Sequence, residues 1–231
     1  MTNKFKKISI IIPVFNEKGS LSDILKKLEM TDFNLEKEII IVDDCSTDGV
    51  DDIYANTKHK VIYHNKNMGK GMAIKTGIMN ANGDIILIQD ADLEYNPIDY
   101  IPMIKLLIED KADVVYGSRL LNENNYNNFL FHSFLANKFL SLLTRVLYNT
   151  DITDMETCYK AMKSDVIKSI QIKSQRFEFE PEITAKLLKK GYKILEIPIT
   201  YNARGIKQGK KIGFWDGIQA ILTLIKYRFV D

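Results

Sequence analysis

Apolar, β-branched runs alternate with amphipathic segments along the first half of the chain. A short apolar run bounded by turn residues is typical of a buried strand, and an apolar stripe at helical spacing is typical of a helix. Strands that are apolar throughout are covered on both faces, so the pattern predicts an α/β fold with a doubly wound, mostly parallel sheet. The expected strands are 7–16, 38–49 with its closing turn, 60–65, 84–92 and 112–119, and the expected helices are 20–30, 69–81 and 97–110.

The second half of the chain is less regular. Residues 122–128 form a low-complexity polar stretch, which we expect to be a mobile loop. No internal repeat is evident, so we expect a single domain over 1–231, with a donor-binding half at about 1–120 and an acceptor-side half at about 121–231. The expected elements here are amphipathic helices at 129–149, 180–192 and 214–229, and a strand at 193–204 that leads into a basic loop.

Polar residues follow four of the expected strands. Ligands of doubly wound sheets bind beyond the carboxyl ends of the strands, so these residues mark a candidate binding edge. Turns after strands are often rich in Asp and Asn. An ordinary turn is therefore the structural alternative at any one strand end, but it explains polar residues at all four strand ends less well. The residues are Asn16 and Glu17, Asp43 and Asp44, Asp90 and Asp92, and Arg119.

Three carboxylates, Asp90, Asp92 and Glu94, follow the apolar run 85–88 at intervals of two residues. Acidic groups that converge repel one another unless a cation lies among them. Oxygen-only ligands favour Mg²⁺ or Mn²⁺ over zinc, which prefers His or Cys. A cation held by one or two carboxylates leaves positions for phosphate oxygens and acts as a Lewis acid on a diphosphate leaving group.

Basic residues that complete such a site are Arg119 and a glycine-containing loop near the C-terminus, although a solubilising loop has the same composition. The formal net charge is +2, but residues 186–231 carry ten Lys or Arg against three acidic residues. This end of the chain is therefore the expected anion-facing end. The loop residues are Arg204, Lys207, Lys210 and Lys211, with Gly205 and Gly209.

Several other kinds of protein are excluded or disfavoured. The glycine-rich stretch 69–77 lacks the Walker spacing of a P-loop NTPase. The three histidines have no metal-ligand spacing, and Cys158 has no His near it in sequence, which disfavours a thiol nucleophile. Two cysteines are too few for a disulfide framework, no signal peptide is expected, and the apolar run 218–225 is too short to span a bilayer.

The ordered set of motifs resembles family 2 glycosyltransferases of the GT-A fold, and most closely the dolichyl-phosphate mannosyltransferase group. The resemblance covers residues 8–215. It rests on "IIPVFNE" (11–17), "IVDDCSTDG" (41–49), "NKNMGKGMAIKTG" (65–77), "QDADLEYNP" (89–97), "YGSR" (116–119) and "YNARGIKQGKK" (201–211).

This resemblance implies metal-dependent transfer of one sugar, with inversion, from a GDP- or UDP-linked donor to a polyprenyl phosphate. It implies a D-x-D type motif at Asp90, Ala91 and Asp92, with Asp92 and Glu94 as ligands of Mg²⁺ or Mn²⁺. Asp90, Asp92, Arg119, Arg204 and Lys210 are then the catalytic set, in which the three basic residues bind phosphate. The residues implied for the base and ribose are Pro13, Phe15, Glu17, Val42 and Asp44.

The chain departs from that pattern in three places. Phe15 stands where Tyr is common, Glu94 stands where Gln is common, and "TDMETCYKAM" at 153–162 replaces a "TGSFR"-like stretch, so the donor sugar stays open. A phosphate acceptor needs no general base, whereas a hydroxyl of a surface polysaccharide or glycolipid needs one, for which Asp154 and Glu156 are the candidates. The lack of a Q-x-x-R-W motif favours a single transfer over processive synthesis.

Two further alternatives are a sugar nucleotidylyltransferase, which usually has a glycine-rich loop after its first strand, and a non-catalytic nucleotide-sugar binding module. A polyprenyl acceptor implies contact with an anionic membrane surface, for which the helices at 129–148 and 214–229 are candidates. Packing against the core or another subunit in a homo-oligomer is the alternative. We expect a cytoplasmic protein, peripheral at the inner face of the membrane, with no nucleic-acid partner.

Overall fold

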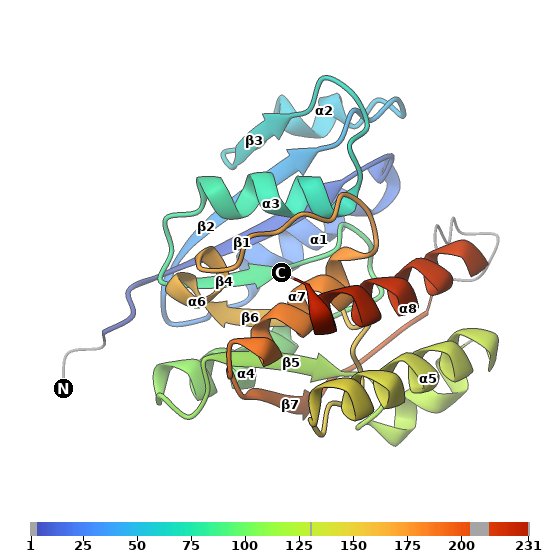
Figure 1. The fold of residues 1–231 in the computed structure, drawn as a ribbon. Coiled ribbons are helices and arrows are strands. Elements are labelled where there is room, and N and C mark those ends of the chain that lie inside the picture. Colours follow the sequence, from blue (N-terminus) through green and yellow to red (C-terminus); the bar gives the residue numbers. More distant parts are fainter. Residues whose placement is uncertain (1–3, 130, 204–212, 231) are drawn as a thin grey trace.

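Seven strands form one mixed sheet in the computed structural model, which describes residues 4–129, 131–203 and 213–230 (Figure 1). The strand order is β3-β2-β1-β4-β6-β5-β7, and β6 alone is antiparallel to its neighbours. The predicted mostly parallel α/β sheet is thereby confirmed. The strands are β1 (Lys7–Val14), β2 (Glu36–Asp43), β3 (Lys60–Tyr63), β4 (Ile85–Ile88), β5 (Val114–Ser118), β6 (Lys160–Lys163) and β7 (Ile194–Pro198).

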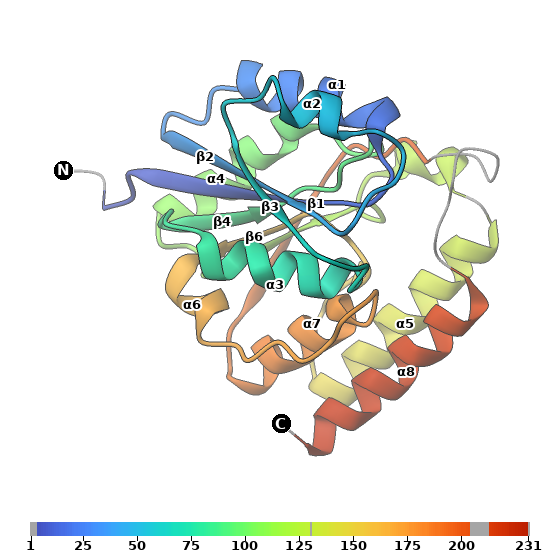
Figure 2. The ribbon, with the colours of Figure 1, turned by 90° about the horizontal axis from the view of Figure 1, so that it is seen from above.

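Helices cover both faces of the sheet, as the apolar strands require (Figure 2). Along β1, Ile10 packs into the core on one face and Ile11 into the core on the other, because successive side chains point to opposite sides. One face carries α1 (Lys18–Met30), α2 (Asp51–Tyr54), the 3₁₀ helix η1 (Pro97–Asp99) and α4 (Tyr100–Ile108), and the other carries α3 (Lys70–Asn80), α6 (Ser164–Lys168) and α7 (Phe179–Lys189).

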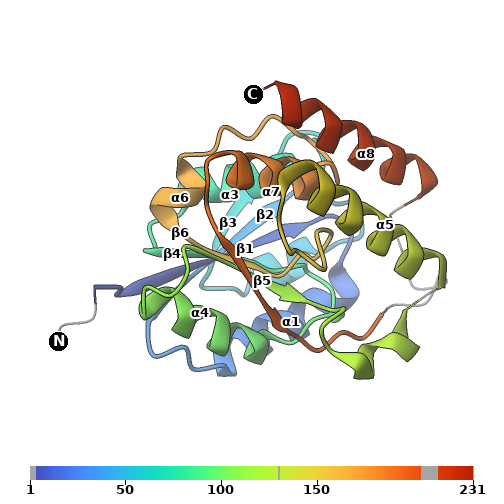
Figure 3. The ribbon, with the colours of Figure 1, turned by 60° about the horizontal axis from the view of Figure 1, so that its bottom comes forward.

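Two long helices, α5 (Phe131–Tyr148) and α8 (Phe214–Phe229), lie side by side beyond α7 (Figure 3). A third apolar cluster, which includes Leu140 and Leu224, holds them together. The Tyr148 hydroxyl also donates to the backbone oxygen of Leu224 at 2.6 Å. Within the described residues, no helix has both the length and the apolar content that a membrane crossing requires.

The sequence predicts most elements but misses the short helices α2 and α6 and the strand β6. It also wrongly predicts a mobile loop at 122–128, where residues 123–128 form the 3₁₀ helix η2 (Glu123–Asn128). The buried side chain of Asn125 donates to the backbone oxygens of Arg119 and Ile199 and accepts from the N–H of Tyr201. Asparagine amides therefore tie this polar stretch to the ends of β5 and β7.

Candidate active site

A cavity of about 1020 Å³ opens at the carboxyl ends of β1, β2, β4 and β5. Residues directly after each strand line it: Phe15 and Glu17 follow β1, Asp44 follows β2, Asp92 follows β4 and Arg119 follows β5. These four strands run in the same direction, so their polar ends meet at one edge. The structure therefore places the residues that follow the strands around a single cavity.

Most of the residues that the sequence singles out line this cavity, while their roles in binding stay predictions. Val42 does not, because it is fully buried in the core between the sheet and α3. Arg204, Lys207, Lys210 and Lys211 lie outside the described residues. The predicted residues that do line the cavity are Pro13, Phe15, Glu17, Asp44, Asp90, Ala91, Asp92, Glu94 and Arg119.

Asp44 fixes the loop that leads into α3. Its carboxylate accepts from the N–H groups of Met68 and Gly69 at 2.8 and 2.7 Å, and its Oδ1 lies 2.7 Å from Nδ1 of His64. Gly69 has a φ of 92°, and a Cβ there would lie 2.5 Å from the backbone oxygen of Gln175. Only glycine fits this turn, so Asp44 and Gly69 together set where α3 begins.

Asp90 pairs with Lys70, the first residue of α3. The Lys70 Nζ lies 2.6 Å from Oδ1 of Asp90, 3.8 Å from Oε1 of Glu180 and 2.9 Å from the sulfur of Cys158. Burial opposes charge on Lys70, but Asp90 and its other neighbours raise the lysine pKa well above its usual value. Burial also raises the pKa of the Cys158 thiol, which keeps it protonated and argues against a thiolate nucleophile.

Asp92 and Glu94 lie on the turn after β4 and face the C-terminal half. Asp92 Oδ1 accepts from the N–H of Glu94 at 3.0 Å, and the Tyr201 hydroxyl donates to Oε2 of Glu94 at 3.2 Å. Among the described residues, no three His, Cys, Asp or Glu are placed to hold a metal ion. Two carboxylates beside a large cavity nevertheless fit Mg²⁺ or Mn²⁺, which take oxygen ligands and share their coordination with substrate phosphates.

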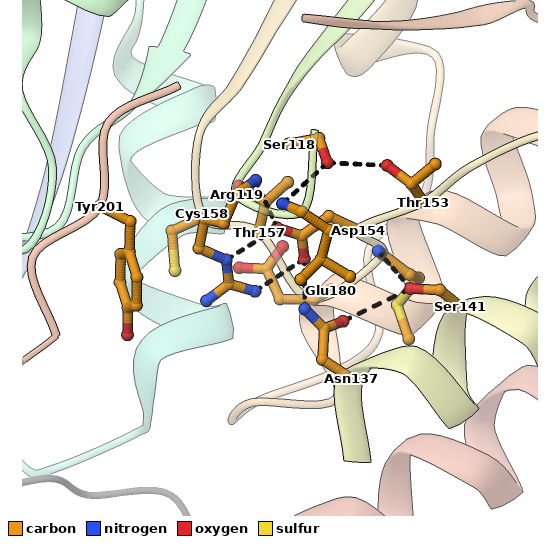
Figure 4. Close-up of polar contacts among 12 residues, drawn as sticks. Ser118, Arg119, Asn137, Ser141, Thr153, Asp154, Thr157, Cys158, Glu180 and Tyr201 are labelled. Carbon is orange, nitrogen blue, oxygen red and sulfur yellow. Dashed lines mark hydrogen bonds and ion pairs between the residues drawn. The ribbon is translucent and has the colours of Figure 1, made fainter. Parts of the chain in front are cut away.

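Arg119 is held rigidly by Asp154 (Figure 4). Its Nε and Nη2 donate to the two carboxylate oxygens at 2.7 Å, its backbone N–H donates to Asp154 at 2.8 Å, and the amide of Asn137 donates to Asp154 as well. Burial favours neutral Asp154, but Arg119 and Asn137 outweigh it and lower the carboxyl pKa. Asp154 is thus a poor proton acceptor, and the geometry argues against the sequence-based suggestion that it is a general base.

Glu156, the other candidate base, has a different environment. It lines the cavity, and its Oε1 is buried without a hydrogen-bond partner among the described residues. Burial and then the neighbouring Glu180 raise the pKa of Glu156 from its usual 4.5 to about 7, although Lys160 and Arg119 oppose the rise. Glu156 is therefore the residue of this pair that exchanges a proton near neutral pH.

We expect Glu156→Gln to stabilise the fold above pH 7. Because the folded-state pKa is raised, ionisation of Glu156 disfavours the folded state, and stability falls as pH rises from 4.5 to about 7. Glutamine removes this loss, which amounts to as much as about 3 kcal/mol. Urea unfolding at pH 5 and pH 8 measures it: the gain of the variant over the wild type should be clearly larger at pH 8 than at pH 5, and an equal effect at both pH values would contradict it.

Helices α5 and α8 line another part of the cavity. Its apolar trough is formed by Phe139 and Leu140 of α5 and Ile218 and Ile221 of α8, and the polar residues His132, Ser133, Asn137 and Asp216 of the same helices line the cavity as well. Phe129 also lines the cavity, and the Arg119 guanidinium lies 5.7 Å from the centroid of its ring. One cavity therefore joins an acidic edge to an apolar trough.

Sequence reasoning missed Lys70, Lys160 and Glu180, which form a charged cluster next to Asp90, in which Lys160 and Glu180 are buried and Lys70 lines the cavity. Lys160 is fully buried on β6 and pairs with Glu180 of α7, which also lies within ion-pair range of Lys70. The sequence offers one signal for Lys70, the "GKG" at the start of a helix that follows a strand. It offers none for Lys160 and Glu180, whose pairing depends on the antiparallel placement of β6.

The fold is that of GT-A glycosyltransferases. Glucosyl-3-phosphoglycerate synthase from Mycobacterium tuberculosis, solved with Mn²⁺, UDP and phosphoglyceric acid, matches 98% of this chain and 80% of its own chain with a TM-score of 0.75. The same synthase solved with Mg²⁺ and UDP matches 98% of this chain and 80% of its own chain with a TM-score of 0.72. The sequence identities of 14% and 15% limit this likeness to the fold.

The chain belongs to glycosyl transferase family 2, whose model matches residues 9–171, and it is a glycosyltransferase. It is 28% identical over 230 residues to dolichol-phosphate mannosyltransferase of Pyrococcus furiosus, covering 96% of this chain and 64% of that protein. It is 27% identical over 219 residues to undecaprenyl-phosphate mannosyltransferase of Micrococcus luteus, covering 90% and 88%. An uncharacterized protein of Methanocaldococcus jannaschii is 30% identical over 197 residues, covering 83% and 80%.

Proposed function

We propose that this glycosyltransferase moves one sugar, with inversion, from a GDP- or UDP-linked donor to a polyprenyl phosphate such as dolichyl or undecaprenyl phosphate. The observation that carries the proposal is the cavity that runs from the acidic sheet edge to the trough between α5 and α8. A donor diphosphate suits the first end and an isoprenoid chain suits the second. Two relatives named as polyprenyl-phosphate mannosyltransferases support the acceptor class.

Asp92 and Glu94 are the residues that would hold Mg²⁺ or Mn²⁺ in this proposal. When bound, the cation supplies Lewis-acid stabilisation of the departing diphosphate. Asp90 lies beside them, and its ion pair with Lys70 fixes the turn that carries Asp92. Pro13, Phe15, Glu17 and Asp44 then line the part of the cavity that receives the nucleoside.

The acceptor phosphate needs no proton acceptor, because one of its oxygens is already ionised near pH 7. The protein must position this nucleophile and offset the charge of the leaving group. Asp154 binds two of the five side-chain N–H donors of Arg119 and so orients the guanidinium. The guanidinium also lies 5.2 Å from the centroid of the Tyr201 ring. Arg119 is a preorganised cation at the point where donor and acceptor phosphates meet.

A transfer assay tests the proposed function. Purified protein is incubated with Mn²⁺, undecaprenyl or dolichyl phosphate, and radiolabelled UDP-glucose or GDP-mannose, and the lipid fraction is counted. We expect label in a mild-acid-labile lipid whose anomeric configuration is opposite to that of the donor. Label found only in a polysaccharide or glycolipid acceptor, or as free sugar, would contradict the polyprenyl phosphate.

One observation favours a second candidate, transfer to a sugar hydroxyl: Glu156 has a pKa of about 7, which suits a general base. Glu156→Gln separates the two functions in the same assay. Loss of a required base costs several orders of magnitude in kcat, whereas transfer to an ionised phosphate survives the change. The phosphate acceptor is contradicted if Glu156→Gln is folded and wholly inactive.

The outer faces of α5 and α8 support the proposal that the enzyme works at a membrane surface. Exposed apolar residues form one stripe on each helix, with basic residues beside them, as in interfacial helices. Such a stripe, close to the apolar trough, suits an enzyme whose acceptor resides in a bilayer. The stripes are Phe131, Leu135, Phe139, Leu142 and Val146 on α5 and Trp215, Leu222, Ile225 and Phe229 on α8, where Phe139 lies at the edge of the cavity that it also lines, and the basic residues are Lys138, Arg145, Lys226 and Arg228.

We expect the protein to co-sediment with liposomes rich in anionic lipid at low salt. Leu142→Asp combined with Val146→Asp should reduce the bound fraction at least about tenfold, because it removes two apolar contacts and adds negative charge. Met30→Asp is the matched control, since Met30 is 85% exposed on α1, which packs on the sheet in a different core cluster from the one that holds α5 and α8. Wild-type protein that stays in the supernatant would contradict membrane binding.

A further inference from the structure

Glu156 is a charged residue of the cavity that neither the proposed metal site nor the Arg119 site uses. It lies on the segment between α5 and β6, and its Oε1 is buried with no hydrogen-bond partner in the described part of the chain. Burying a carboxyl oxygen without a partner costs free energy, and native proteins rarely leave such groups unsatisfied. This carboxyl is therefore a candidate for binding a substrate group.

The nearest cations do not satisfy Glu156, because other groups already bind them. Arg119 is bound at both Nε and Nη2 by Asp154. Lys160 is paired with Glu180, and its Nζ also donates to the backbone oxygens of Met155 and Thr157. Both cations therefore already bind other carboxylates, and neither hydrogen-bonds Oε1 of Glu156.

The position of Glu156 places it beside the proposed donor site. Cys158, two residues further along, contacts Lys70, and Lys70 contacts Asp90 at the start of the acidic motif. All four residues line the same cavity. In the proposed function, the acidic motif binds the donor diphosphate, so the sugar attached to that diphosphate lies within this part of the cavity.

The chemistry of the Glu156 carboxyl indicates that its ligand is a neutral hydroxyl and not a phosphate. An ionised carboxylate repels phosphate, and the charges of Arg119 and Lys160 are each already offset by another carboxylate. A sugar hydroxyl suits both protonation states, because it donates to a carboxylate and accepts from a carboxyl group. Charged hydrogen-bonding groups are also the ones that discriminate most strongly between sugars that differ at one hydroxyl.

We propose that Glu156 binds a hydroxyl of the transferred sugar and selects the donor by that contact. The proposal rests on the proposed function for the placement of the donor, but not on the identity of the acceptor. It differs from a general-base role, in which Glu156 would contact the acceptor hydroxyl. The two roles predict different responses to changes in the donor.

Binding measurements test the proposal without requiring transfer. Calorimetry with Mn²⁺ compares UDP with UDP-glucose and GDP with GDP-mannose, for the wild type, Glu156→Ala and Glu156→Gln. The pair in which the sugar increases wild-type affinity is then repeated with 2-, 3-, 4- and 6-deoxy donors. We expect one deoxy donor to bind the wild type about 10- to 100-fold more weakly than its parent, and Glu156→Ala to bind the two equally well, with unchanged affinity for the nucleotide diphosphate.

Three outcomes would overturn the proposal. One is a loss of nucleotide diphosphate affinity in Glu156→Ala as large as the loss for the nucleotide-sugar. Another is a deoxy series with the same pattern in the wild type and both variants. A third is a wild type in which none of the sugars adds affinity over its nucleotide diphosphate. Glu156→Gln keeps the shape of the side chain and provides a second variant that is expected to fold. If the enzyme transfers sugar to a hydroxyl acceptor, the proposed acceptor is refuted, but the comparison of donors still tests the role of Glu156.

Discussion

Replacing Asp92 with asparagine is expected to lower kcat/KM for sugar transfer by about 1000-fold or more, because a Lewis acid on the leaving group supplies several kcal/mol of transition-state stabilisation. Asparagine keeps an oxygen that accepts from the N–H of Glu94, so the turn after β4 should persist. It removes the negative charge that the cation requires. Steady-state transfer with Mn²⁺ measures the loss, and a thermal shift with Mn²⁺ and nucleotide diphosphate measures binding independently of turnover.

Asp23→Asn is the matched control for this change. Asp23 lies on α1 with an exposed side chain, and the same substitution there should leave both transfer and the thermal shift unchanged. If Asp92→Asn transfers sugar at the wild-type rate and still shows the Mn²⁺ shift, the cation is not held at Asp92. The assignment of Glu94 as its partner would then be abandoned as well.

The sheet is predictable from sequence because its strands are buried on both faces. All four residues of β4 are fully buried, and the apolar run "IILI" by itself predicts a core segment. Strand β6 is different, since its residues, "KAMK", carry no apolar run. It forms because β4 and β5 both pair with it, and its first residue, Lys160, is buried only because Glu180 and backbone oxygens accept from it.

The edge at which the site lies also follows from sequence, whereas the partners of its residues do not. Parallel strands bring Asp44, Asp92 and Arg119 together by topology alone. Lys70 meets Cys158 across 88 residues of sequence, and no local pattern records such a contact. Helix α7 is also hard to interpret from sequence, because a charged helix face is expected to be exposed, whereas Glu180 and Glu182 are both buried.

Asp154→Ala is expected to lower the free energy of unfolding by about 3–5 kcal/mol, the usual cost of removing one partner of a buried ion pair. Asp154 is fully buried, and its loss leaves the Arg119 guanidinium and the Asn137 amide without their acceptor. Urea unfolding at pH 7 measures the effect. A double variant in which Leu replaces both Arg119 and Asp154 should recover part of the lost stability, because it leaves no buried charge unpaired.

The effect of Asp154 should depend on pH in a defined direction. Burial opposes ionisation, but Arg119 lowers the pKa of Asp154 below its usual 3.8 in the folded protein, so its contribution is present above 3.8 and is lost as pH falls through the folded-state pKa. The difference between the wild type and Asp154→Ala should therefore shrink in acid. A difference that stays constant down to pH 2 would contradict a charged pair.

This stability effect changes how loss of activity at Asp154 must be interpreted. Asp154→Asn keeps the size of the side chain but offers Arg119 one oxygen where the wild type offers two, so the guanidinium is no longer fixed. We expect turnover with polyprenyl phosphate to fall about 10- to 100-fold through this displacement, and to remain measurable. Its pH profile should keep the shape of the wild-type profile. Complete loss in a stably folded Asp154→Asn would instead show that Asp154 takes part in proton transfer, against the geometry that ties it to Arg119.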